Sequence, residues 1–211
     1  MNPRNRLPSD TPPPPADTST KLAWILGGVA MALAVTAVVA GVKASRRPRN
    51  RHVPEPAKGV DLQRYMGRWY ELGRYENRFE RDCDVVTADY SLGRGGKVQI
   101  VNACRLDGGD GTFKKSKGRA RIVRGSNGAK LKVAFFGPFY IGDYWVLDHA
   151  DDYSWSIVGE PRGTYLWLLS RRSNPGEDVR RAIYARAAEL GYDTAAIRPT
   201  WQGTAASQHG T

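Results

Sequence analysis

The sequence contains few of the residues on which catalytic centres and metal sites are built. Cysteine occurs twice and histidine three times in 211 residues. There is no glycine-rich phosphate-binding loop and no Gly-x-Ser-x-Gly nucleophile motif. His52 and His209 lie outside the domain predicted below, and His149 falls in an Asp-rich turn, where a solvated side chain is the ordinary interpretation. We therefore expect no metal, no cofactor and no catalytic residue.

The net charge of +11 is unevenly placed along the chain. Residues 1–59 carry nine Lys and Arg against three Asp and Glu, a net +6, and residues 60–211 carry the remaining +5. More than half of the excess positive charge thus precedes the predicted domain, which argues against nucleic acid as a partner.

The first 59 residues fall into three segments of different composition. Residues 1–21 include the tract PSDTPPPPADTST and are expected to be disordered, because such a composition cannot form a core. Residues 22–42 carry no charged side chain, and as a helix they would span roughly 31 Å, about the thickness of a bilayer core. Residues 43–59 are basic and contain proline, as expected of a linker. At the other end, residues 203–211 are expected to be a disordered tail.

Residues 22–42 are predicted to be a transmembrane anchor or a signal helix. The run is long for a signal peptide, which favours an uncleaved anchor, although Val42 and Ala44 have the small side chains of a leader-peptidase site. No cysteine stands near its end, so a bacterial lipoprotein anchor is excluded. More basic residues follow the run than precede it, and the positive-inside rule alone would keep the domain in the cytoplasm.

The two cysteines indicate the opposite location. Cys83 and Cys104 belong to segments rich in β-branched residues that SLGRGG joins, which predicts a hairpin. With the turn centred on Gly93 and Arg94, the cysteines stand directly opposite each other, and a disulfide would stabilise the fold by about 3 kcal/mol. Two unpaired buried thiols are the alternative. We expect the disulfide, and hence a domain in the periplasm or otherwise outside the cytoplasm, membrane-anchored or secreted after cleavage.

Short strands follow at regular spacing. They are expected at residues 112–123, 129–136, 143–148, 153–159 and 164–171, which predicts a β-sandwich or a closed barrel. One helix follows them, with Asn174 as its cap, Pro175 at its first position, Glu177 completing a capping box and Gly191 at its end. Its apolar stripe consists of Val179, Ala182, Ile183, Ala187 and Leu190.

Residues 164–171 are apolar on both faces. We expect one face to look into the barrel and the other to lie under the helix. Tyr165, Trp167 and Leu169 form the inner face, and Leu166 and Leu168 the outer face. The same alternation puts Leu131, Val133 and Phe135 inside. In residues 112–123, small side chains share one face, and the other face carries Lys115, Lys117, Arg119 and Arg121.

Three motifs, present in order, resemble those of the lipocalin family, in the branch of bacterial and apolipoprotein D-like lipocalins. Gly67 and Trp69 match the first motif, Asp143 and Tyr144 the second, and Arg171 the third. FFGPFY at residues 135–140 and RFER at residues 78–81 also resemble this branch. The predicted domain is residues 60–202, and the lipobox cysteine common in the branch is missing.

The resemblance implies an all-β fold: an eight-stranded antiparallel up-and-down barrel with a C-terminal α-helix packed on its wall and room for one small ligand. In the family Trp69 plugs the closed end and Arg171 packs across it, so both are structural and do not bind the ligand. On this first strand, Trp69, Glu71, Gly73 and Tyr75 are expected to face inward. Arg68, Tyr70, Leu72 and Arg74 are expected to face outward.

The function that the resemblance implies is to bind, store or transport a hydrophobic ligand, a fatty acid or lysophospholipid, in membrane maintenance. The candidate lining residues are Glu71, Tyr75, Leu131, Val133, Phe135, Tyr165 and Trp167. Glu71 would either orient the ligand head group or be held by cavity tyrosines. Two alternatives are an enzyme acting on lipids or a small isoprenoid, and a membrane-tethered scaffold without ligand. A homodimer is left open.

Overall fold

The computed structural model describes residues 47–109, 111–135 and 137–203. The predicted segments 1–21 and 22–42 lie outside these residues, as does most of the predicted C-terminal tail. Within the described part of the chain, no helix is long and apolar enough to cross a membrane.

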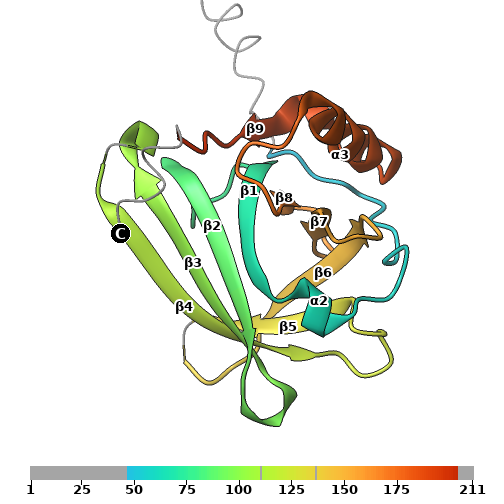
Figure 1. The fold of residues 1–211 in the computed structure, drawn as a ribbon. Helices are drawn as coiled ribbons and strands as arrows, with labels where there is room; N and C mark the ends of the chain where they lie inside the picture. The colour runs from blue at the N-terminus through green and yellow to red at the C-terminus, as the bar shows by residue number, and fades with distance from the viewer. Residues whose placement is uncertain (1–46, 110, 136, 204–211) are drawn as a thin grey trace, which may run out of the picture. The chain divides into compact units, whose positions relative to one another are not determined.

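Eight consecutive antiparallel strands form a closed barrel (Figure 1). Their bounds are β1 Gly67–Tyr75, β2 Cys83–Leu92, β3 Val98–Leu106, β4 Phe113–Ile122, β5 Lys130–Ala134, β6 Gly142–His149, β7 Trp155–Gly159 and β8 Leu166–Ser170. Each strand pairs with the next, and β1 pairs with both β8 and β2, which closes the cylinder. The predicted fold class is confirmed for the barrel and its helix.

Apolar side chains are divided between two cores, on opposite sides of the barrel wall. The inner core lies inside the barrel and includes Trp69, Leu131 and Leu169. The outer core lies between the wall and helix α3, Glu177–Glu189, and includes Leu166 and Leu168. Strand β8 therefore contributes alternate residues to the two cores, as its doubly apolar pattern predicts.

A short helix, α2, crosses one end of the barrel immediately before β1. It spans Leu62–Tyr65, and the Asp61 side chain caps it by accepting hydrogen bonds from the backbone N–H groups of Gln63 and Arg64. Its Tyr65 is buried in the inner core. This end is the closed end, and the β1–β2 loop lies at the opposite, open end.

A β-bulge in β1 overturns the predicted inward face of its second half. The register against β8 shifts between Glu71 and Gly73, so that Gly73 stands opposite Leu168 and Arg74 opposite Trp167. The extra residue reverses which side chains face the lumen. Gly73 and Tyr75 therefore face α3 and β9, while Arg74 turns to the inner side, contrary to the strict alternation expected from the sequence.

The β2–β3 hairpin contains the predicted disulfide in a different register. Cys83 and Cys104 are bonded, with Cα atoms 5.5 Å apart. Cys83, however, stands opposite Leu106, and the register shifts between Asp84 and Thr87. The predicted two-residue turn is wrong because Arg94–Gly96 form a 3-10 turn in which Gly95 and Gly96 adopt positive φ, which lengthens the connection.

Helix α3 is confirmed, but its predicted cap is wrong. The N-cap is Gly176, with no side-chain cap hydrogen bond, and the Asn174 side chain instead accepts a hydrogen bond from Arg180. Ile183 and Ala187 are fully buried against the outer wall of the barrel. Gly191, with φ of +86°, follows the helix end, as the sequence predicts.

Residues 47–59, expected to be part of a linker, pack against the barrel. Asn50 is buried; its backbone N–H donates to the Gly163 carbonyl, and its side chain donates to the Leu190 carbonyl. Ala57 donates to the Leu147 carbonyl. The folded unit thus begins before residue 60.

The C-terminal segment completes the wall between β1 and β2. Strand β9, Ile197–Pro199, pairs with the second half of β1, where β1 no longer contacts β2. Beyond it, the Trp201 carbonyl accepts from the Val85 N–H, and the Gln202 side chain donates to the carbonyls of Glu71 and Val86. The last described residues therefore join the two strands that the bulge separates.

Candidate functional site

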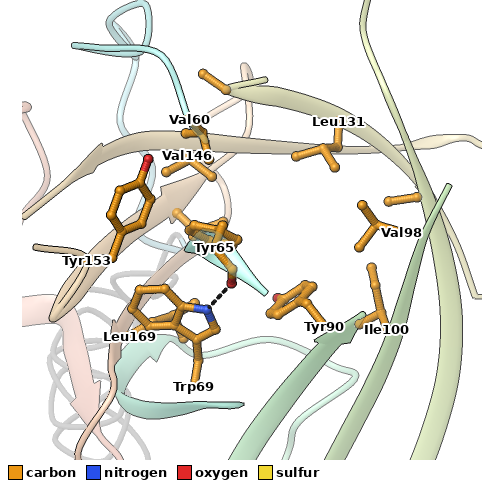
Figure 2. Close-up of a cluster of buried hydrophobic side chains, with 13 residues drawn as sticks. Val60, Tyr65, Trp69, Tyr90, Val98, Ile100, Leu131, Val146, Tyr153 and Leu169 are labelled. Atoms are coloured by element: carbon orange, nitrogen blue, oxygen red, sulfur yellow. Dashed lines mark hydrogen bonds between the residues drawn. The ribbon is translucent and has the colours of Figure 1, made fainter. Parts of the chain in front are cut away.

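Trp69 and Arg171 seal the closed end of the barrel. The Trp69 indole is fully buried, and its N–H donates to the Tyr65 carbonyl at 2.9 Å (Figure 2). The Arg171 guanidinium lies 3.8 Å from the centre of the indole ring and donates to the carbonyls of Arg64 and Arg68. Gly67 has φ of +94°, and a Cβ there would lie 3.3 Å from the Arg171 guanidinium. These contacts join α2 and β1 to Arg171, the residue that follows β8.

Three tyrosines form a hydrogen-bonded layer above this seal. The Tyr144 hydroxyl lies 2.9 Å from the hydroxyls of both Tyr65 and Tyr90, and Tyr65 also reaches Ser156 at 3.2 Å. Burial raises the pKa of Tyr65 to about 12 and that of Tyr144 well above its usual range, so both remain neutral. The tyrosine layer is therefore an uncharged, satisfied part of the inner core.

The space beside this layer holds no more than one water molecule. The cavity measures about 10 Å³, which is close to the minimum for a single water. Leu131 and Val133 line it together with the tyrosines Tyr65, Tyr90 and Tyr144. A lipid chain does not fit in this space, so uptake of a lipid by the barrel would require room nearer the mouth.

The wall nearer the mouth is partly exposed on its inner side. Ala88, Asn102 and Ser116 stand side by side on β2, β3 and β4, and all three are half-buried. Phe135 and Trp167 are also half-buried and pack against the inner core. A Cβ on Gly118 would lie 2.7 Å from the Phe135 ring, so glycine leaves the space that this ring occupies.

Asn102 places an unused polar atom on this wall. Its side-chain oxygen is buried and has no hydrogen-bond partner within the described residues. Every second residue of β3 faces inward, and Asn102 is the next such residue after the buried Val98 and Ile100. A buried acceptor without a partner is costly, so it is suited to a ligand that donates a hydrogen bond.

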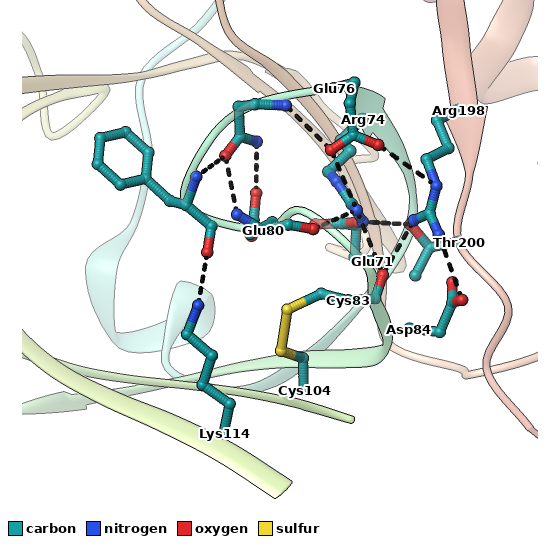
Figure 3. The surroundings of a disulfide bond; sticks show 12 residues. Glu71, Arg74, Glu76, Glu80, Cys83, Asp84, Cys104, Lys114, Arg198 and Thr200 are labelled. Carbon is teal, nitrogen blue, oxygen red and sulfur yellow. Dashed lines mark hydrogen bonds and ion pairs between the residues drawn. A yellow bond between two sulfur atoms is a disulfide. The ribbon is translucent and has the colours of Figure 1, made fainter. Parts of the chain in front are cut away.

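The β1–β2 loop, residues 76–82, lies at the open end of the barrel, and Figure 3 shows several of its side chains near the disulfide. Its Glu80 carboxylate accepts a hydrogen bond from the Trp167 indole at 2.8 Å and another from Asn77 at 2.6 Å. Lys114 donates to the Phe79 carbonyl at 3.0 Å. The loop is thus connected to β8 and to β4, on two sides of the opening.

Aromatic rings form the β8 side of the mouth. Tyr165 stacks on Trp167 with ring centres 5.5 Å apart and planes 7° apart, and Phe79 lies 6.1 Å from Tyr165. Phe79 itself is about half exposed. This arrangement offers apolar contact surface at the entrance.

A buried charged pair lies behind the mouth, in the wall between β1 and the C-terminal segment. Arg74 and Glu71 form an ion pair at 2.7 Å, and the Thr200 hydroxyl also donates to Glu71 (Figure 3). Burial, with the nearby Glu80 charge, raises the pKa of Glu71 to about 7 against the opposing effect of Arg74. Arg74 further donates to the carbonyls of Glu80 and Cys83, which fixes the loop to the wall.

The candidate lining residues are divided among different places. Val133, Phe135 and Trp167 pack against the inner core, Leu131 belongs to it near the closed end, and Tyr165 lies at the mouth. Tyr75 does not face the lumen: it lies in the outer core, and its hydroxyl accepts from the Asp193 N–H at 2.8 Å. The bulge after Glu71 is the reason.

Glu71 also differs from expectation in its partners. It is held by Arg74 and Thr200 rather than by tyrosines. Sequence reasoning missed Glu80, Asn77 and Asn102, which are polar residues near the lumen. Nothing in the sequence marks these residues as part of a site, because Asn77 and Glu80 belong to a loop and Asn102 follows the ordinary alternation of a strand.

His149 and Asp143 have structural surroundings. His149, expected to be solvated, is buried and stacks on Tyr153 at 4.2 Å, and its Nδ1 and Nε2 atoms lie 2.7 Å and 3.1 Å from the carbonyl oxygens of Ala150 and Gly59. Asp143 forms an ion pair with Lys132 across β5 and β6. Among the residues described, no group of His, Cys, Asp and Glu has the arrangement of a metal site.

Comparison with known proteins agrees with this geometry. A family model for a lipocalin-like domain matches residues 60–202, and the chain belongs to the lipocalin family. It is 38% identical over 146 residues to the outer membrane lipoprotein Blc of Escherichia coli K12, covering 66% of this chain and 81% of that protein. It is 36% identical over 155 residues to temperature-induced lipocalin-1 of Arabidopsis thaliana, covering 70% and 82%.

Relatives with lower sequence identity include an apolipoprotein D and a lipocalin-like fold among the solved structures. Apolipoprotein D of Mus musculus is 31% identical over 138 residues, covering 63% of this chain and 70% of that protein. Among solved structures, apocrustacyanin C2 superimposes with a TM-score of 0.58 at 17% identity, covering 74% of this chain and 91% of that one. The structural likeness concerns the fold alone.

Proposed function

We propose that this protein binds the acyl chain of a fatty acid or lysophospholipid in the mouth half of its barrel. In this role it stores or carries the lipid outside the cytoplasm as part of membrane maintenance, and it catalyses no reaction. The observation that carries the proposal is that two aromatic side chains, Phe135 and Trp167, are only half-buried and pack on the inner core. Side chains already fill the closed end of the barrel, so these two rings offer apolar surface nearer the mouth. Aromatic surface of this kind suits an acyl chain.

The polar atoms near the lumen support a ligand with a polar head. The unpartnered Asn102 oxygen suits a hydroxyl or protonated carboxyl donor, while Lys114 at the mouth suits a carboxylate or phosphate. The names of the relatives, which include outer membrane lipoproteins and an apolipoprotein, also favour a lipid ligand.

Organic extraction of purified full-length protein, followed by mass spectrometry, tests the proposal. One class of lipid at near-stoichiometric amount is expected, and delipidated protein should bind a fluorescent fatty acid that lysophospholipid displaces. Absence of lipid together with no binding after delipidation would favour the scaffold alternative. Conversion of the added lipid to a product would favour the enzyme alternative.

The proposed location has its own test. The Cys83–Cys104 bond is expected to be formed in the cell, since the compartment outside the cytoplasm is oxidising. Alkylation of free thiols during cell lysis should leave both cysteines unmodified. Two alkylated cysteines would place the domain in the cytoplasm.

A further inference from the structure

The outer face of β4 carries a row of four cations that lipid binding in the lumen does not explain. Lys115, Lys117, Arg119 and Arg121 alternate along the strand, and all four are exposed. Alternate residues on a strand lie about 6.7 Å apart, so the row is about 20 Å long. The inward positions between them are Ser116, Gly118 and Ala120.

The neighbouring strands do not neutralise this row. Opposite it on β3 stand Ala103, Val101 and Gln99, and none of them is acidic. Lys115 and Lys117 make no ion pair with any described residue. A protein normally separates or pairs like charges on one sheet face, because their repulsion is destabilising. The row therefore has positive charge available for an external anion.

Apolar side chains border the same row. Phe113, on the outer face at the start of β4, is 49% exposed, and Phe139 and Ile141 in the β5–β6 loop are 71% and 86% exposed. This loop lies beside the row, because Arg119 donates to the Gly137 carbonyl at 2.7 Å. The Tyr140 ring lies within 5.5 Å of the guanidinium groups of Arg119 and Arg121. Large exposed apolar groups beside cations are unusual on a purely solvated surface.

We propose that this β4 basic surface, formed by Lys115, Lys117, Arg119, Arg121, Phe113, Phe139 and Ile141, docks on an anionic lipid bilayer. Cations meet the lipid phosphates while the apolar side chains enter the interface, which is the combination that interfacial membrane binding requires. A free polyanion such as nucleic acid would use the cations but would leave Phe139 and Ile141 in water. The inference concerns the outside of the barrel and does not depend on a ligand in the lumen.

The test uses the full chain reconstituted in lipid nanodiscs at one copy per disc, with hydrogen–deuterium exchange as the measurement. Discs of phosphatidylglycerol are compared with discs of phosphatidylcholine. The backbone amides of Gly137 and residues 139–141 are expected to exchange at least about fivefold more slowly in the anionic discs, since even one near-surface cation contributes about that factor. High salt should remove the difference.

Two charge-reversal variants distinguish an effect of the cations on β4 from an effect of the net charge of the whole protein. Lys115→Glu with Lys117→Glu should abolish the anionic protection. The matched control, Arg94→Glu with Lys97→Glu, makes the same change at two exposed residues of the β2–β3 turn and should retain it. Phe139→Ser with Ile141→Ser, which alters no charge, should weaken the protection as well. Melting curves verify that each variant folds.

Several results would overturn the proposal. Equal exchange in the two kinds of disc would show that the surface does not dock on anionic lipid. Equal loss of protection in both charge-reversal variants would assign the effect to net charge alone. Protection that appears only at two or more copies per disc would assign the surface to self-association instead.

Discussion

Glu80 accepts a hydrogen bond from the indole of Trp167 at 2.8 Å and so joins the β1–β2 loop to β8 across the mouth of the barrel. The same carboxylate oxygen accepts from Asn77 at 2.6 Å. Ligand entry through the mouth has to pass beneath this loop or displace it. Trp167 therefore holds the loop over the mouth, and in the proposed function it also contacts the ligand.

Trp167→Ala is expected to weaken lipid binding about tenfold or more, which corresponds to a loss of about 1.4 kcal/mol of contact. The indole is half-buried on the inner side of the wall and stacks on Tyr165. Folding should survive, because the backbone pairing of β8 is unchanged. Titration with a fluorescent fatty acid, with circular dichroism for folding, makes the measurement.

Two control variants separate contact from the loop connection and from stability. Trp167→Phe keeps an aromatic ring and removes the donor to Glu80, so it should retain most of the affinity while speeding ligand release. Leu168→Ala changes the next residue, which is fully buried in the outer core, and should lower stability without changing affinity. Unchanged affinity in a folded Trp167→Ala protein would mean that this indole does not line the site.

Arg171→Ala is expected to destabilise the protein by about 1 to 3 kcal/mol, because the change removes a cation stacked on Trp69 and leaves two carbonyls without their donor. The relative affinities for different lipids should stay the same, since the closed end is filled. Thermal melting and competition titrations together test this. An unaltered melting temperature would contradict a structural role for Arg171.

Glu71 is expected to make stability depend on pH. Its pKa is about 7 in the folded protein against 4.5 as the ordinary value, so folding favours the protonated form. This contribution is fully present below about pH 4.5 and is lost as the pH rises through 7. The total change is up to about 3 kcal/mol.

The Glu71→Gln variant isolates this effect. Urea unfolding of the wild type at several pH values should show the free energy of unfolding falling between pH 4.5 and pH 7 relative to the variant. Only the slope is compared, because the substitution also removes the ionic partner of Arg74. Parallel curves for the two proteins would show that Glu71 titrates at its ordinary pKa.

Replacing both cysteines by serine is expected to lower the free energy of unfolding by about 3 kcal/mol, since the bond closes a loop between residues 21 apart in sequence. The β1–β2 loop begins its connection to β2 at Cys83, so faster ligand exchange at the mouth should accompany the loss. Denaturant unfolding and stopped-flow ligand release measure the two effects. A doubly substituted protein with wild-type stability would rule out the stabilising role of the bond.

The spacing of the strands predicted a sandwich or a barrel, the resemblance to lipocalins selected the barrel, and the apolar stripe of residues 179–190 predicted the helix. The two faces of β8 also left a pattern: inward Trp167 and Leu169 and outward Leu166 and Leu168 follow from plain alternation. Local departures from alternation left no such pattern. One extra residue in β1 moved Tyr75 to the outside and Arg74 to the inside.

The disulfide shows how a correct result can follow from an incorrect register. Gly95 and Gly96 lengthen the β2–β3 turn, and a shift between Asp84 and Thr87 partly offsets it, so the cysteines still meet. The polar residues near the lumen were beyond prediction for a different reason. Glu80 is placed by the conformation of its loop, and pairing of Glu71 with Arg74 depends on the bulge.

The join between β1 and β2 depends on residues 200–202, which are far from both strands in the sequence. Thr200 and Gln202 bond Glu71 across 129 and 131 positions of sequence, and Trp201 accepts from Val85. A growing chain that already contains all eight strands still lacks the segment that satisfies the buried Glu71 and Arg74. Closure of this part of the wall therefore requires the C-terminal segment, because the eight strands alone leave Glu71 without the Thr200 donor and the carbonyls of Glu71 and Val86 without the Gln202 donor.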